Sequence, residues 1–339
     1  KDIKVYLNFA SLIKSKSKIE KIDLTSEEID IEKLKKIILK TKPSNLNSLI
    51  NNRVKNGKIT INLELFFKNN LEINNFIARG DIQDLEGIIN DKLNLKKTNF
   101  NFFADSSDIL IKNLKSSLNG LKIDNGNLLI KNDKQIKVKS EFSTRVNLDE
   151  SNIKNYSPLL NRKNFINNKT KLKATLENFI DITFDKTFKV IDYVYTNKGK
   201  IENSLFYLDK SFASEFLEKE IKFINFIDTN IQSRYASDDK NSFFVSGKYS
   251  INDDNFKEYS LKNNFNKKTQ SINLNLKIDQ ILKLNFINYK KDFGKIADIS
   301  LNFEVKKDRI NVHKFIFKEG KNSISVEKLK IKKQKLVSL

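Results

Sequence analysis

The only histidine, His313, is the first residue to consider for chemistry, because imidazole can act as a general base or bind a metal ion. It lies between Val312 and Lys314 in a run that alternates apolar and polar residues. The chain contains no cysteine, so the sequence excludes a disulfide framework and a thiolate metal site. We therefore interpret His313 as an ordinary strand or surface residue.

The other side chains that could do chemistry occur in turn-like contexts. Acidic pairs at Asp105 with Asp108, Asp238-Asp239 and Asp253-Asp254 lack the ligand spacing of a calcium loop. Two Ser-x-x-Lys strings, Ser11 to Lys14 and Ser151 to Lys154, have no companion motifs. The sequence has no phosphate-binding loop, dinucleotide fingerprint or nucleophile elbow. We therefore predict that the protein is not an enzyme and uses no cofactor or metal.

The dominant pattern of the chain is the alternation of apolar and polar residues. From Ile136 to Leu148 every even-numbered residue is apolar or a small Ser or Thr, and the residues between them are polar. Successive side chains of a strand point to opposite faces, so such a strand has one apolar face and one polar face. The pattern recurs at Ile59 to Leu65, Ile272 to Ile278 and Ile299 to Val305. What the apolar face contacts must therefore decide the function.

The segment from residue 25 to residue 56 predicts helices instead. Thr25-Ser26-Glu27-Glu28 has the form of a capping box, in which the Thr hydroxyl and the Glu carboxylate satisfy early amide donors. An apolar stripe follows until Lys40, and Pro43 ends that helix. A second short helix is predicted from Asn45 to Lys55, closed by Gly57.

Strands are predicted over most of the remaining chain. We divide the sequence into strands at 1–24 that continue from a missing N-terminal part, a helical insertion at 25–56, and two β-groove segments at 57–150 and 151–339. The region 211–235 is either a helix or two strands. A recurring Gly-Lys-Ile at 57, 199 and 294 is either a structural repeat or chance. Strands are predicted at 58–67, 71–80, 98–104, 108–115, 126–131, 135–148, 171–177, 179–195, 199–207, 242–251, 258–265, 271–278, 280–290, 296–306, 309–318 and 322–332.

The net charge of +21 allows three interpretations. Nearly all of the basic residues are lysines spread over polar strand faces, whereas arginine is the residue favoured for bidentate phosphate and base contacts. A solvated surface is therefore the preferred interpretation, followed by attraction to anionic lipid headgroups and then by nucleic-acid binding. We expect no nucleic-acid partner.

The start of the chain lies inside an alternating run, because Ile3, Val5, Leu7 and Phe9 follow Lys1. The sequence contains no methionine, no signal peptide and no apolar stretch of about 18 residues. We therefore expect a fragment of a longer protein, with any membrane anchor outside this sequence.

Degenerate patterns of one style recur along the chain, at Ile31-Glu32-Lys33-Leu34 through Ile50, Val54 to Ile59, Ile77 to Ile82, Leu114 to Gly120, Ile123 to Ile130, and Ile287 through Ile331. With these patterns, the stretch from Asp30 to Leu148 and the tail resemble the AsmA-like family of bacterial envelope proteins, in particular its YhdP and TamB types.

The resemblance implies a long, curved antiparallel sheet that forms an open groove, or gutter, with a short helical insertion near the N-terminus. It also implies a periplasmic protein of a Gram-negative envelope, anchored to the inner membrane by a missing N-terminal helix. Such proteins are thought to carry phospholipids toward the outer membrane. The expected partners are therefore phospholipids, with acyl chains in the groove, and the two membranes.

We expect the groove to be lined by the apolar sets of the alternating strands. The alternative is a structural or adhesive β-protein whose apolar faces pack on one another, as in a β-sandwich, without a ligand. The expected lining residues are Ile59, Ile61, Leu63, Leu65, Ile136, Val138, Phe142, Val146, Ile272, Leu274, Leu276, Leu284, Phe286, Ile299, Leu301 and Phe303.

Overall fold

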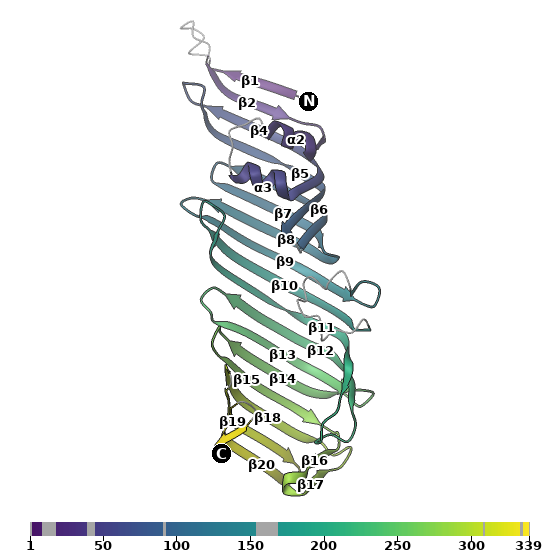
Figure 1. Cartoon of the computed structure of the whole chain (residues 1–339). Coiled ribbons are helices and arrows are strands. Elements are labelled where there is room, and N and C mark those ends of the chain that lie inside the picture. Colours follow the sequence, from purple (N-terminus) through teal and green to yellow (C-terminus); the bar gives the residue numbers. More distant parts are fainter. Residues whose placement is uncertain are drawn as a thin grey trace. The chain divides into compact units, whose positions relative to one another are not determined.

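Antiparallel strands make up most of the computed structural model, which describes residues 2–8, 18–38, 45–90, 93–153, 169–307, 309–332 and 335–338 (Figure 1). The chain forms two units, Lys1–Arg145 with Asn178–Tyr193 and Val146–Glu177 with Val194–Leu339. The strands belong to a large antiparallel sheet with short helices near the N-terminus. The predicted fold class, a mainly β chain whose curved sheet forms an open groove, is confirmed.

The first unit pairs its strands in sequence. β2 pairs with β1 and with β4, β3 pairs with β4, and each strand from β4 to β8 pairs with the next. Its elements are β1 (Asp2–Leu7), β2 (Ile19–Thr25), β3 (Ile29–Asp30), α2 (Ile31–Ile38), α3 (Asn45–Arg53), β4 (Val54–Phe67), β5 (Ile73–Asn90), β6 (Leu93–Asp105), β7 (Asp108–Leu118), β8 (Leu121–Asn132) and most of β9 (Ile136–Leu148).

The second unit pairs in the same way, except that β15 pairs with β18 and leaves the hairpin of β16 and β17 as a separate small sheet. The strands β10 (Lys171–Phe184) and β11 (Val190–Phe212) contribute residues to both units. The remaining elements are β12 (Ile221–Ala236), β13 (Asn241–Ile251), β14 (Lys257–Phe265), β15 (Gln270–Ile278), β16 (Leu282–Leu284), η1 (Asn285–Ile287), β17 (Tyr289–Lys291), β18 (Ala297–Lys306), β19 (Arg309–Glu319), β20 (Asn322–Lys332) and β21 (Lys335–Ser338).

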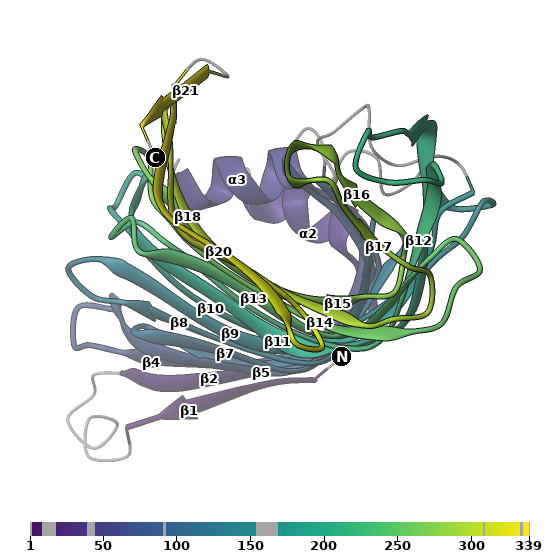
Figure 2. The same cartoon turned by 90° about the horizontal axis from the view of Figure 1, so that it is seen from below.

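The burial of β9 follows its sequence alternation. Its even-numbered residues from Ile136 to Leu148 are buried or half-buried, and its odd-numbered residues except Ser143 are exposed. Within each unit the strands curve around one face (Figure 2). We call this concave face the inward face and the other the outward face.

Bulges make several strands of the first unit longer than the alternation predicts. Asp84, Lys97, Asn113 and Asn125 have left-handed backbones with φ between 48° and 57°, and each lies at a shift of strand register. A bulge inserts one residue, bends the strand and reverses the parity of the residues that follow. The alternation restarts after Lys97 and Asn125, so the strands predicted at 98–104 and 126–131 begin there. The observed strands β6 and β8 begin before these bulges.

The two helices lie within the curve of the first unit (Figure 2). Ile31 of α2 is buried against β4, because a Cβ at Gly57 would lie 2.9 Å from its Cδ1 atom. The Lys35 ammonium donates to the Val54 carbonyl oxygen at 3.1 Å. The helix pair therefore covers part of the inward face near the start of β4.

The predicted capping box is wrong. Thr25 ends β2, and the first helix begins at Ile31. The Ser26 amide donates to the Ile61 carbonyl oxygen at 2.9 Å. The Ile61 amide in turn donates to the Ser26 hydroxyl oxygen at 3.0 Å. Glu28 forms an ion pair with Lys58 at 2.6 Å. Tertiary partners on β4 therefore replace the helix cap.

The β16–β17 hairpin covers one end of the second unit's inward face. Leu282 of β16 packs in a buried cluster with Ile278, Ala297 and Phe317, and Tyr289 of β17 stacks edge-on against Phe317. The single strand predicted at 280–290 is therefore wrong, because this segment folds back over the sheet. The buried Lys291 ammonium donates to the Gln280 carbonyl oxygen at 2.7 Å, and burial lowers its pKa.

Other local predictions are also corrected. Residues 221–236 form the single strand β12, and Leu217 makes an isolated bridge to Leu282, so the region 211–235 is not a helix. The predicted boundary between strands at 171–177 and 179–195 is wrong, because β10 continues to Phe184. Gly57, Gly199 and Gly294 lie respectively in β4, inside β11 and outside the strands, so the Gly-Lys-Ile recurrence marks no structural repeat.

Gly80 is expected to be essential for the packing of β4 on β5. A Cβ at this position would lie 1.9 Å from the Thr60 carbonyl oxygen, so Gly80→Ala requires a backbone shift. We expect a loss of stability of about 1–3 kcal/mol, measured by chemical denaturation. Gly87→Ala, on the same strand with a nearest contact of 3.2 Å, is the control and should cost less. Equal losses from both variants would contradict this account of the close approach.

Candidate functional site: the inward apolar face

The predicted lining residues of the first unit share one face. The register pairs Ile61 with Gly80, Gly80 with Phe102, Phe102 with Ile111, Ile111 with Leu128, and Leu128 with Ser140. Opposed residues of an antiparallel pair lie on the same side of a sheet. These pairings therefore place two sets that are far apart in sequence on the same face of the sheet. The sets are Ile59, Ile61, Leu63 and Leu65 of β4, and Ile136, Val138 and Phe142 of β9.

The predicted residues of the second unit are also neighbours. Ile272 opposes Phe303, Leu274 opposes Leu301, and Leu276 opposes Ile299. All six side chains are half-buried. They are inward-facing, because Ile299 opposes Phe317 and Phe317 packs beneath the hairpin that lies within the curve (Figure 2).

Three predicted lining residues do not belong to these two sets. Leu284 pairs with Tyr289 in the small hairpin sheet and is not part of the main sheet, so its assignment to a sheet strand is wrong. Phe286 lies in the 3-10 turn η1, and its side chain is outside the described residues. Val146 continues the half-buried set of β9 but belongs to the second unit.

An aromatic cluster on the inward face of the second unit was not predicted. Phe226 lies 5.9 Å from Phe206 and 5.2 Å from Tyr259 between ring centroids, and Tyr259 lies 5.8 Å from Tyr249. Burial raises the pKa of both Tyr249 and Tyr259, so their hydroxyls stay neutral at physiological pH. The Tyr249 hydroxyl donates to the Lys277 carbonyl oxygen at 2.9 Å. The abundance of Phe was the available signal, but the bulge at Asp228 hides the alternation.

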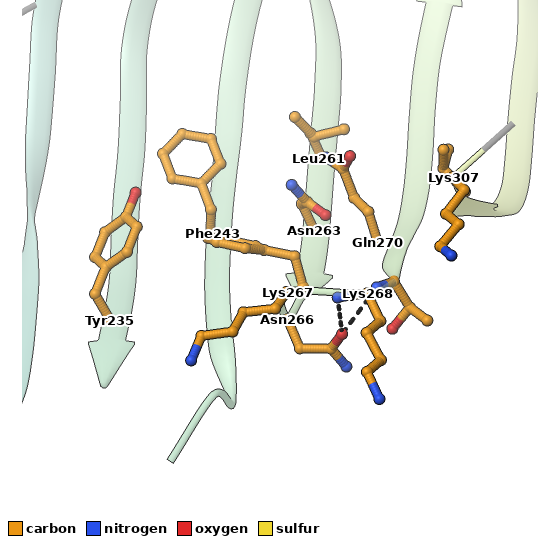
Figure 3. A pocket seen from close by; sticks show the side chains of 12 residues that line it. Tyr235, Phe243, Leu261, Asn263, Asn266, Lys267, Lys268, Gln270 and Lys307 are labelled. Atoms are coloured by element: carbon orange, nitrogen blue, oxygen red, sulfur yellow. Dashed lines mark hydrogen bonds between the residues drawn. The ribbon is translucent and has the colours of Figure 1, made fainter. Parts of the chain in front are cut away.

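An open hollow on this face lies where β14 turns into β15. It is an open depression of about 760 Å³, within the size range of ligand pockets. Its apolar lining comes from Tyr235, Phe243, Leu261, Phe265 and Val305. Figure 3 shows Lys267 and Lys268 toward the turn, Phe243 and Leu261 farther along the strands, and Lys307 on the right beyond Gln270.

Unpaired polar atoms lie one row in from this turn. The Oδ1 atoms of Asn197 and Asn263 and the Oγ atom of Ser233 are buried, and none has a hydrogen-bond partner among the described residues. The register places them in one row across the strands, with Phe243 between Ser233 and Asn263. Buried polar groups normally have partners, so these unpaired and solvent-inaccessible atoms are an exception on the inward face.

The outward face carries charge. Lys21 lies 2.7 Å from Glu64 and 2.9 Å from Asp23, and these hydrogen bonds lower the pKa of both carboxyl groups. A depression of about 470 Å³ on this face of the second unit is lined by such residues as Glu258, Lys277 and Lys318. The outward face is thus the solvated side that the sequence predicts.

His313 and the acidic pairs lie in strands, turns and ion pairs that indicate structural roles. His313 is exposed at a register shift of β19. The Asp105 carboxylate accepts the amides of Ser107 and Asp108 at 2.8 Å, as in a turn. The Arg234 guanidinium lowers the pKa of Asp238 to about 2. Within the described ranges no group of three or more His, Asp or Glu side chains could hold a metal ion.

Comparison with models of protein families, with curated proteins and with solved structures finds no match to this chain. The described helices include none that is long and apolar enough to span a membrane.

Proposed function

We propose that this chain is a segment of a bridge-like protein of the AsmA-like type. In this proposal it carries phospholipids across the periplasm, between the inner and outer membranes, with acyl chains on the inward faces. One observation carries the proposal. In each unit an apolar face runs over consecutive strands, and many of its side chains stay half-buried because the described helices and the β16–β17 hairpin cover only parts of these faces.

The energetics of lipid transfer favour such a surface. Moving one acyl CH₂ group from a membrane into water costs about 0.8 kcal/mol, so a sixteen-carbon chain costs roughly 12 kcal/mol. Isolated apolar contacts cannot offset that cost. A row such as Leu261, Leu274 and Leu301, which the register places side by side on three strands, offers continuous contact without recognising one particular lipid atom.

The alternative is a structural or adhesive β-protein with a self-packed core. The β16–β17 hairpin favours it locally, because Leu282 and Tyr289 seal Phe317 from solvent. Farther along the same strands, however, Leu274, Leu301 and Phe303 remain half-buried. The closed core is therefore limited to one end of the second unit's inward face, which supports the groove over the alternative.

Photo-crosslinking at adjacent positions of β15 tests the proposal. A photoreactive amino acid at Leu274, on the inward face, should crosslink radiolabelled phospholipid when the chain is expressed in a bacterial host. The same amino acid at Asn275, which is exposed on the outward face, is the control and should not. Equal labelling at both positions, or none at Leu274 in a folded protein, would count against lipid binding in the groove.

A further inference from the structure

We infer that the depression at the β14–β15 turn is a headgroup site for anionic phospholipids. The phosphate group would lie beside Lys267, Lys268 and Lys307, and the acyl chain would lie along Phe243 and Leu261 (Figure 3). The inference rests on the proposed function and adds to it a preference for negatively charged lipids at one end of the strands.

Charge is the first argument. Lys267 and Lys268 lie in the β14–β15 turn and Lys307 follows β18, whose Val305 lies directly opposite Gln270. All three lysines line the depression, and no carboxylate is among the described residues that do so. None of the three makes an ion pair within the described ranges, whereas the neighbouring Lys306 is paired with Glu304 at 2.9 Å.

The acidic residues nearby are already engaged. Asp239 accepts hydrogen bonds from the Lys267 amide at 3.1 and 3.2 Å, and among the described residues it makes no ion pair with the Lys267 ammonium. Asp238 is paired with Arg234 at 2.9 Å. Asn266 fixes the turn, because its Oδ1 atom accepts the amides of Lys268 and Thr269 at 2.8 Å. The turn therefore presents cations that have no carboxylate partner among the described residues of the site.

The order of surface types along the strands is the second argument. Lys267 and Lys268 at the turn are followed along the strands by the row of Gln270 and the aromatic Phe265, and then by Phe243 and Leu261. An anionic phospholipid likewise has a charged phosphate at one end and hydrocarbon tails that extend from it. Free phosphate would match the lysines alone and leave the apolar part uncovered.

Binding of two short-chain phospholipids to the full chain tests the inference. Phosphatidylglycerol is anionic and phosphatidylcholine is zwitterionic, and both are used below their micelle concentrations with identical tails. We expect the chain to prefer phosphatidylglycerol. The triple variant Lys267→Gln, Lys268→Gln, Lys307→Gln should weaken phosphatidylglycerol binding about tenfold and leave phosphatidylcholine binding nearly unchanged.

A matched triple variant, Lys248→Gln, Lys262→Gln, Lys330→Gln, removes the same charge from the outward face and should bind both lipids as the unmodified chain does. Equal effects of the two triple variants, or no preference between the lipids, would overturn the headgroup site while leaving the groove intact. Tight binding of inorganic phosphate would overturn it too, as an anion site without lipid. Failure of the unmodified chain to bind either lipid would instead contradict the proposed function.

Discussion

Val138→Asp combined with Phe142→Asp is expected to lower the amount of phospholipid bound to the first unit at least about tenfold. Both side chains are half-buried on the inward face of β9. A carboxylate at either position would leave about two acyl CH₂ groups without apolar contact, about 1.6 kcal/mol, which corresponds to more than a tenfold change in binding. Labelled phospholipid from vesicles, crosslinked by a photoreactive amino acid at Ile61 on the same inward face, gives the result for the first unit alone.

The control places two carboxylates on the outward face of the same unit, at Lys112 and Lys137, where both side chains are exposed. Lys112→Asp with Lys137→Asp changes the net charge more than the test variant does, so a purely electrostatic effect would be larger in the control. We expect the control to bind lipid normally. Unchanged binding by the folded Val138→Asp, Phe142→Asp chain would refute the assignment of β9 to the groove.

Phe317→Ala should produce the largest loss of stability among single changes in the second unit. Phe317 is 2% exposed and packs with Ile278, Leu282 and Ala297, and its ring lies 5.8 Å from that of Tyr289. Truncation of a buried Phe costs about 3–5 kcal/mol because apolar contact is lost and a cavity remains. Hydrogen exchange should show faster exchange of the β16–β17 amides, since the hairpin loses the residue on which it packs.

Phe103→Ala is the matched control, because Phe103 is 40% exposed on the outward face of β6. A surface change of this kind is expected to alter stability by less than about 0.5 kcal/mol. Similar losses from both variants would mean that the hairpin cluster is not the main core of the second unit.

The apolar lining was predictable from sequence because it depends only on the alternation of apolar and polar residues along each strand. Ile272, Leu274 and Leu276 alternate without interruption, and so do Ile299, Leu301 and Phe303, so the register had only to place the two sets opposite each other. The aromatic cluster was not predictable. Asp228 adopts a left-handed backbone at a bulge, and the residues before and after it therefore follow different parities.

The hairpin and the headgroup depression depend on contacts between segments far apart in sequence. Leu282, Lys283 and Leu284 look like one more strand, yet the buried Lys291 and the packing of Leu282 on Phe317 fold them back over the sheet. Lys267 and Lys307 come together because β15 pairs with β18 and not with the segment that follows it. The Thr25 capping box failed for a related reason, because Ser26 and Glu28 found partners on β4.

Native mass spectrometry of the chain, purified from a bacterial host without denaturant or detergent, tests most directly whether the inward faces hold lipid. The account predicts that a substantial fraction of the folded chain carries the added mass of one or more phospholipids, which organic extraction then identifies. A folded chain that is uniformly free of lipid, and that takes up none from vesicles, would contradict the account and favour the self-packed structural alternative.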